Sequence, residues 1–311
     1  MAGDRPGVHP APDGRLLGLR IDVDTHDGMR DGVPSLLATL ARHKARGTFY
    51  LSMGPDRSGL AVRNLLRPGF LAKMRRTRAA RLYGWRTVLS GTLLPARPIA
   101  TAFPVIARRI VEEGHEAGVH AWDHRRWQDS LPRLPACEVV SQLDRGREAF
   151  DRIFGTPPKT YAAPAWLTDE RALAHQEKLG LTYASDCRGE EPFLPVIAGR
   201  TLRTPQVPTT LPTLDEALGG RFESAGAYFD AVLAQALLQP WPVLTIHAET
   251  EGGPYAADLD TFLGKATRAG RRSVTLGELL AARLATGTPL PAWQMGYGEI
   301  DGRHGRVSQP L

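Results

Sequence analysis

A chain of 311 residues with 42% hydrophobic content is long enough to enclose one sizeable core, and single α/β barrels commonly reach this length. It contains no run of about 18 apolar residues, and residues 1–14 lack the apolar stretch of a secretory signal, so we expect neither a signal peptide nor a transmembrane helix. The net charge of +6 is unevenly distributed, because residues 57–109 hold twelve Lys or Arg and no Asp or Glu.

From residue 16 onward, short β-rich runs alternate with runs of helical periodicity, which is typical of βα units around a parallel sheet. Strands are predicted over residues 16–24, 47–54, 115–122, 160–166, 181–187, 203–208 and 242–249. Helices are predicted over residues 33–44, 104–113, 137–154, 224–238 and 276–285, with another after Thr168. About seven βα units result, fewer than a closed barrel contains, so we expect an α/β fold with an incomplete (β/α)7-type barrel.

The chain divides into a barrel and two short ends. We expect the barrel to cover residues 15–285 and to include a basic insertion over 57–109, which is much longer than an ordinary βα connection. Residues 1–14 form an N-terminal extension, and residues 286–311 form a tail rich in Gly and Pro. We expect both ends to pack loosely.

Acidic and histidine side chains follow the ends of two predicted strands. Asp22 and Asp24 end the first strand and share one face of it, so both can point into the barrel mouth. His120 and His124 in HAWDH are four residues apart, a spacing that lets two imidazoles converge on one metal ion. Such a pair alone is more often a coincidence of packing or surface. A carboxylate from another strand end favours a metal site with open positions for water and substrate.

A further histidine, His247, closes the predicted strand 242–249. One interpretation is a core histidine whose hydrogen bonds are satisfied. Beside a metal site it is instead a candidate acid, because the ordinary pKa of imidazole lies near neutral pH.

Together these segments resemble the NodB-like polysaccharide deacetylases, metal-dependent hydrolases with an incomplete (β/α) barrel. The first motif of that family corresponds to DVD, the second to GHEAGVHAWDH and the last to LTIH. The resemblance implies that Asp22 is the general base, that Asp24 binds the metal with His120 and His124, and that His247 is the general acid. The ion would be divalent, and Zn, Mn, Fe and Co all suit two His and one Asp.

One motif departs from the family pattern. Many members carry an Arg in the third motif that orients the catalytic Asp, whereas the matching stretch here is AAPAW. Arg188 in SDCRG is the candidate to supply this charge, and the alternative is an arginine paired with a neighbouring acid. The residues expected to contact substrate are Trp166, Asp186, Arg188 and Glu249.

Within the family, LRIDVDT, HAWDH, SDCRG, TLPTLDE and TIHAETEG resemble one branch, over residues 16–284. That branch removes the formyl group from 4-deoxy-4-formamido-L-arabinose linked to undecaprenyl phosphate, in lipid A modification and resistance to polymyxin and other cationic antimicrobial peptides. The resemblance implies a linear-amide hydrolase with an undecaprenyl-phosphate-linked amino sugar as its substrate. It also implies a peripheral location on the cytoplasmic side of the inner membrane.

The basic insertion matches a basic amphipathic helix that lies on a bilayer. Residues expected to contact the anionic inner-membrane surface or the lipid phosphate are Phe70, Met74, Arg75, Arg76, Arg78 and Trp85. The alternative is a solvated basic face whose apolar residues pack on the barrel.

Two other functions remain open. An N-deacetylase of an N-acetylated sugar polymer or glycolipid would use the same metal and roles, but the basic insertion and the expected absence of a secretion signal argue against it. A non-catalytic binder of acidic polymers would leave the acids and histidines without a role. The sequence has no recognised nucleic-acid motif, so we expect no nucleic-acid partner, and no protein partner is inferred.

Overall fold

The structure is a computed structural model that describes residues 15–59, 95–303 and 305–311. Its centre is a seven-stranded parallel sheet in the order β5-β4-β3-β2-β1-β8, with β9 also paired to β1. The strands are β1 (Leu16–Val23), β2 (Thr48–Ser52), β3 (Glu116–Ala121), β4 (Thr160–Tyr161), β5 (Tyr183–Ala184), β8 (Val243–His247) and β9 (Arg272–Val274). The strand order is an open path from β5 to β8, which agrees with the predicted incomplete barrel.

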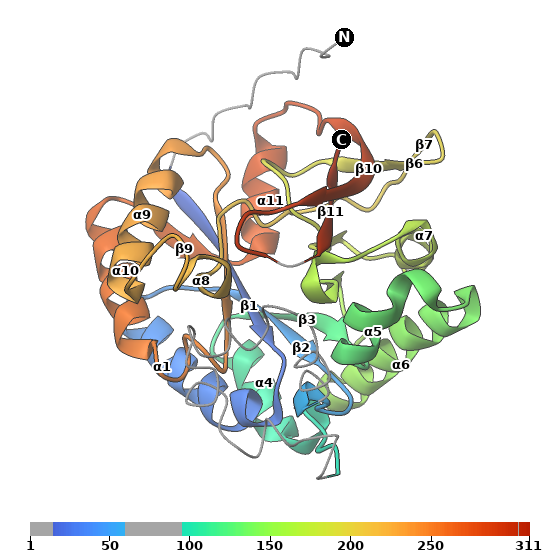
Figure 1. Cartoon of the computed structure of the whole chain (residues 1–311), viewed down its shortest axis with the longest axis horizontal. Coiled ribbons are helices and arrows are strands. Elements are labelled where there is room, and N and C mark those ends of the chain that lie inside the picture. The colour runs from blue at the N-terminus through green and yellow to red at the C-terminus, as the bar shows by residue number, and fades with distance from the viewer. Residues whose placement is uncertain (1–14, 60–94, 304) are drawn as a thin grey trace.

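Helices surround this sheet, as Figure 1 shows. They are α1 (Val33–Arg42), α4 (Pro104–Glu112), α5 (His124–Ser130), α6 (Ala136–Phe154), α7 (Glu170–Lys178), α8 (Leu214–Ala217), α9 (Ala225–Leu238), α10 (Ala256–Arg268) and α11 (Leu276–Ala285). Short turns of helix are η1 (Gly28–Gly32), η3 (Ala100–Ala102), η4 (Leu131–Arg133) and η5 (Pro164–Trp166). The predicted helices over 33–44, 104–113, 137–154, 224–238 and 276–285 therefore all form.

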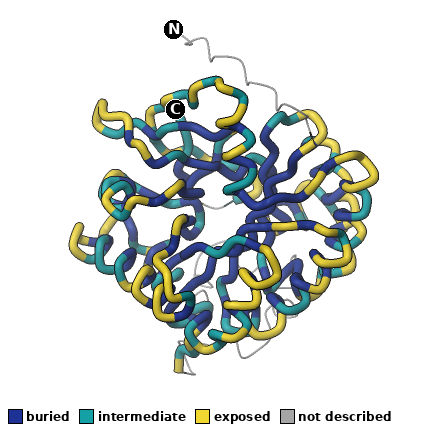
Figure 2. Tube along the Cα trace, turned by 180° about the vertical axis from the view of Figure 1, so that it is seen from behind, coloured by how far each residue is buried: buried dark blue, intermediate teal, exposed yellow. Residues whose placement is uncertain are grey.

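Strand β1 lies in the middle of the sheet, and all eight of its residues are buried. Burial on both faces explains why the sequence there is an almost continuous apolar run. Leu17, Leu19 and Ile21 belong to the same core cluster as the apolar residues of α1. Arg20 and Asp22 alternate with them and therefore lie on the opposite face. In Figure 2 the buried residues fill the centre and the exposed ones follow the outer helices.

The tail is more ordered than the sequence indicated. Strands β6 (Leu194–Ile197), β7 (Arg200–Thr201), β10 (Ala292–Glu299) and β11 (Arg306–Pro310) form a second sheet in the order β11-β10-β6-β7. The expectation that residues 286–311 pack loosely is therefore wrong for the described part of that tail. The partners of β10 are β6 and β11, and Val307 and Ser308 of β11 are buried.

The strand predicted over residues 203–208 is also wrong. Among these residues only Gln206 makes β-bridges, and they are isolated ones to Ala184 and Phe193. Pro205 and Pro208 have no N–H to donate, so a continuous ladder cannot form through them.

Part of the basic insertion is described. Its C-terminal end contains η3 and the start of α4. The six residues expected to contact the membrane all fall within 60–94, outside the described residues. In the described part of the chain, no helix has the length and apolar character needed to span a bilayer.

Candidate metal centre

The first and third strands bring three side chains together at their carboxyl ends. Asp24 follows β1, His120 lies in β3, and His124 is the first residue of α5. Oδ1 of Asp24 lies 3.3 Å from Nε2 of His120, and its Oδ2 lies 3.3 Å from Nε2 of His124. The three ligand atoms all lie within 4.8 Å of one another, a spacing that one ion can bridge.

Neighbouring elements fix the orientation of both imidazoles. Nδ1 of His120 is 2.7 Å from the carbonyl oxygen of Ala162, so Nδ1 carries the proton and Nε2 presents a lone pair. Asp123 caps α5 by accepting a hydrogen bond from the N–H of Arg126 at 3.0 Å, and its Oδ2 lies 3.0 Å from Nη1 of Arg57. Because His124 follows this cap, Asp123 and Arg57 set where the helix begins.

The electrostatics of the triad suit a cation. Burial, opposed by nearby carboxylates, lowers the pKa of His120 to about 4, and burial together with Arg125 lowers that of His124 to about 3, so both are neutral at neutral pH. Oδ1 of Asp24 is buried without a hydrogen-bond partner among the described residues. Three facing lone-pair donors without a proton between them are costly to bury, and a divalent ion removes that cost. The side chains therefore fit such an ion.

Asp22 lies beside the triad and is held by an arginine of its own strand. Nε of Arg20 donates to Oδ1 of Asp22 at 2.8 Å, and Nη2 donates to Oδ2 at 2.7 Å. Both side chains are buried, and Nη1 of Arg20 donates to the carbonyl of Ser185. Burial raises the pKa of Asp22, but Arg20 and then His120 outweigh it and lower that pKa to about 2.

Arg20 therefore has the role that we had expected of Arg188, and that expectation is wrong. Nη1 of Arg188 donates to both carboxylate oxygens of Glu216 at 3.1 Å, and its Nη2 donates to the carbonyl of Leu211 at 2.8 Å. Sequence reasoning missed Arg20. The available signal was a single charge inside an apolar strand, two residues before Asp22 and hence on the same face.

His247 ends β8 and pairs in register with Asp22 of β1. Burial disfavours its charged form, but Asp215, Asp24 and Glu251 outweigh burial and raise the pKa of His247 to about 9. The imidazole is therefore protonated at neutral pH. Its backbone N–H donates to Oε2 of the buried Glu251 at 2.8 Å, a contact that the sequence did not indicate.

The other expected substrate contacts lie at different depths. Trp166 is buried, has a positive φ of 52° like its neighbour Ala165 at 57°, and donates from Nε1 to Oγ1 of Thr209. Asp186 is fully buried and accepts from Gln206 at 3.1 Å, and its contact with substrate stays a prediction. Glu249 is half-buried beside Asp24, and burial, then the charge of Asp24, raises the pKa of Glu249 to about 8.

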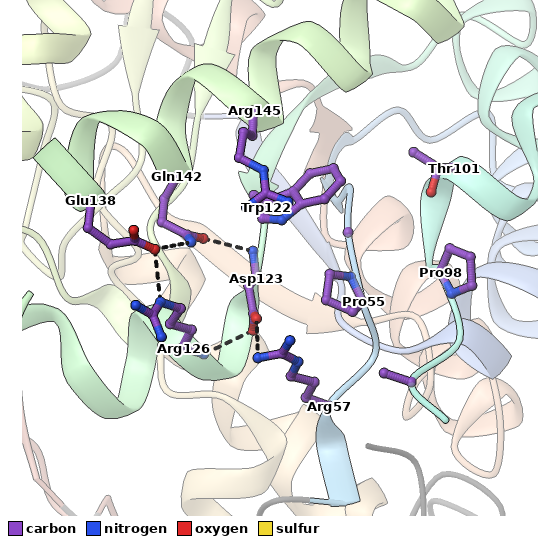
Figure 3. Close-up of a pocket in the computed structure, with 12 residues that line it drawn as sticks. Pro55, Arg57, Pro98, Thr101, Trp122, Asp123, Arg126, Glu138, Gln142 and Arg145 are labelled. Atoms are coloured by element: carbon purple, nitrogen blue, oxygen red, sulfur yellow. Dashed lines mark hydrogen bonds and ion pairs between the residues drawn. The ribbon is translucent and has the colours of Figure 1, made fainter. Parts of the chain in front are cut away.

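A pocket of about 440 Å³ adjoins the triad without containing it. Figure 3 shows the pocket, with Asp123 and its ion pair to Arg57 on one wall. The guanidinium of Arg145 lies 4.3 Å from the ring centroid of Trp122 on another wall. None of the three triad side chains lines this space, so the pocket borders the start of α5 rather than covering the triad.

Fold and site together define a class of protein. The profile of the polysaccharide deacetylase family matches residues 24–184, which include the whole triad, and the chain belongs to this family. A solved polysaccharide deacetylase structure from Mycobacterium smegmatis has a TM-score of 0.61 at 18% identity, covering 94% of this chain and all of that one, and supports the fold.

Two curated relatives are similar over nearly the whole chain. One is the probable 4-deoxy-4-formamido-L-arabinose-phosphoundecaprenol deformylase ArnD of Shewanella sediminis, 36% identical over 94% of this chain and 93% of that protein. The other has the same name in Wigglesworthia glossinidia brevipalpis and is 29% identical over 90% of this chain and 97% of that protein.

Proposed function

We propose that this protein hydrolyses the formamide of 4-deoxy-4-formamido-L-arabinose-phosphoundecaprenol, giving formate and the 4-amino sugar lipid. The observation that carries the proposal is the similarity to the Shewanella deformylase over 94% of the chain. The reaction adds one water across the C–N bond: the formyl carbon gains an oxygen, and the nitrogen leaves as an amine.

In this proposal Asp24, His120 and His124 hold a divalent ion, since their ligand atoms converge. The ion would polarise the formyl carbonyl and make a water molecule more acidic. Zn, Mn, Fe and Co remain the candidates. The bond between His120 and the carbonyl of Ala162 keeps one lone pair available for the ion at all times.

Asp22 is proposed as the general base. Arg20 holds both of its oxygens and keeps it ionised throughout the neutral range, because the pKa of Asp22 is lowered to about 2. Each carboxylate oxygen retains a lone pair beyond the one that Arg20 occupies. Asp22 can therefore accept the proton of the attacking water without turning away from Arg20.

His247 is proposed as the general acid. Its pKa of about 9 leaves it charged at neutral pH, so it has a proton to give to the departing nitrogen. The support is that Asp22 and His247 are register partners on adjacent strands, β1 and β8. Glu249 and Trp166 are proposed to shape the sugar site around them.

We further propose that the protein works as a peripheral protein on the cytoplasmic face of the inner membrane, where a lipid-linked sugar is accessible. The support is the charge of residues 57–109, twelve Lys or Arg without a single acid. Each basic side chain near an anionic leaflet contributes about 1 kcal/mol of attraction.

The test is formate release from formamido-arabinose linked to a short-chain polyprenyl phosphate. We expect turnover that a chelator abolishes and that added divalent metal restores, and little turnover of the matching acetamido sugar. Asp24→Asn is the matched inactive control. Faster hydrolysis of the acetamido compound would replace the deformylase proposal with a deacetylase.

A further inference from the structure

The turn that follows β10 contacts Trp166 and Glu216. Arg303 lies in this turn, and its backbone N–H donates to the carbonyl of Ile300 at 3.1 Å. Its guanidinium lies 4.7 Å from the ring centroid of Trp166, and its Nη1 lies 3.4 Å from Oε1 of Glu216. Arg20, which holds Asp22 beside the triad, lies against the same ring, with its guanidinium carbon 5.4 Å from the centroid.

The turn is closely fitted to α8. Gly302 has φ of +81°, and a Cβ built there would lie 2.0 Å from the carbonyl oxygen of Glu216. Only glycine allows this approach, because any side chain would collide with the backbone of α8. The position of Arg303 is therefore set by a backbone contact and does not depend on its own side chain.

Three arginines lie around the ring of Trp166, and two of them form ion pairs with the same carboxylate. Arg20 is matched by Asp22, whereas Arg188 and Arg303 share the single carboxylate of Glu216. Arg188 uses both oxygens of Glu216 at 3.1 Å, and Arg303 reaches only one of them at 3.4 Å.

Of these three arginines, Arg303 makes the fewest hydrogen bonds to other described residues. Its side chain is 16% exposed, against 9% for Arg188 and none for Arg20. A guanidinium has five N–H donors, and the contact to Glu216 engages one nitrogen. The ring of Trp166 packs against the flat face of the Arg303 guanidinium and fixes its orientation. The remaining N–H donors can therefore bind an anion.

We propose that Arg303 binds the phosphodiester that links the sugar to its lipid. The inference rests on the proposed function, since it assumes that the sugar presents its formamide to the triad. C1 and C4 lie on opposite sides of a pyranose ring. When the formamide on C4 faces the triad, the phosphate on C1 therefore points away from the triad. An arginine can hold two phosphate oxygens in parallel, which selects phosphorylated over neutral sugars.

The test compares two substrates, the decyl phosphodiester of 4-formamido-arabinose and its decyl glycoside without phosphate. We expect the wild type to prefer the phosphodiester in kcat/KM and Arg303→Gln to reduce this preference about 10- to 100-fold, as for a lost hydrogen bond to a charged group. The loss should appear in KM, because the contact exists before and during the reaction. Arg303→Lys should recover part of it.

Arg306→Gln is the matched control. Arg306 lies in β11 and donates to the carbonyl of Tyr297 on the exposed surface, so the substrate preference should stay within twofold of wild type. Thermal unfolding of both variants shows whether the turn remains folded. An unchanged preference in a folded Arg303→Gln, or an equal loss on both substrates, would overturn the proposal.

A binding measurement separates this proposal from the proposed function. Calorimetry with the decyl phosphodiester of 4-amino-arabinose requires no turnover, and we expect its affinity to fall at least tenfold in Arg303→Gln. Such a fall in an enzyme that releases no formate would refute the deformylase function and support the phosphate site. Inorganic phosphate that binds as tightly and with the same dependence on Arg303 would show a general anion site and overturn the proposal.

Discussion

Removing the guanidinium of Arg20 tests how the proposed base is held. Two charge-assisted hydrogen bonds of 2.8 and 2.7 Å join Arg20 to Asp22, and the pKa of Asp22 is lowered from 3.8 to about 2 in spite of its burial. A difference of this size corresponds to roughly 2 kcal/mol of preference for the ionised form. In Arg20→Met burial is opposed only by His120 and His247, so the pKa of Asp22 should rise.

The sign of the pH effect follows from the role of Asp22. A base must be ionised, so its contribution to the rate disappears as the pH falls through its pKa. The acid limb of kcat/KM should therefore move upward by about two pH units in Arg20→Met. The stability of the fold changes in the same direction. The ion pair stabilises the folded protein above the unfolded pKa of Asp22, near 4, and this stabilisation is lost as the pH falls toward 2. At neutral pH, Arg20→Met should therefore be less stable by about 3–5 kcal/mol.

The assay is a pH profile of formate release from pH 2.5 to 9, with bound metal measured at each pH so that loss of metal is not mistaken for titration of Asp22. Arg20→Lys, which keeps a charge but lacks the two-pronged contact, should fall between the wild type and Arg20→Met. A folded, metal-loaded Arg20→Met with the wild-type acid limb would refute this account of the base.

Three further predictions concern the triad, the acid and the tail. Asp24→Asn should lower the metal content, whereas Asp22→Asn should keep the metal and lower kcat roughly 10²- to 10⁴-fold, which metal analysis beside kinetics distinguishes. His247→Gln should lower kcat by a similar factor, with the largest deficit on substrates with the most basic leaving amine; a uniform deficit would argue against the acid role. Gly302→Ala should reproduce the loss of phosphate preference, because its Cβ meets Glu216, while Gly226→Ala, in α9 with open space around it and no positive φ, should keep that preference.

The barrel could be predicted because each unit carries its own local signal. The apolar run of β1 and the amphipathic pattern of α1 are readable within a few residues. Strands β10 and β11 were missed because β10 is stabilised by pairing with β6, about 100 residues earlier, and β11 by pairing with β10. No strand forms over residues 203–208, because its two prolines cannot donate the backbone hydrogen bonds of a continuous strand.

The site divides in the same way. Asp24, His120 and His124 could be nominated because they lie at or just after the ends of two strands, and parallel strands bring their ends to one rim. Arg20 was missed because a charged residue inside a strand does not by itself indicate its partner. The partner follows only from the alternation of a strand, which puts Arg20 and Asp22 on the same face. Arg303 was hidden for a different reason: the second sheet carries it to the rim, and nothing local to GRHG indicates that sheet.

The pairing of Arg20 with Asp22 has a consequence for how this protein can diversify. Both residues belong to one central strand that is buried throughout, so no surface loop is needed to hold the proposed base. The stretch AAPAW after β4 therefore does not have to supply an arginine for that contact. Because Ala162 orients His120 and Trp166 supports Arg303, natural variation or an engineer can reshape residues 163–165 toward other sugars while Arg20 continues to hold Asp22.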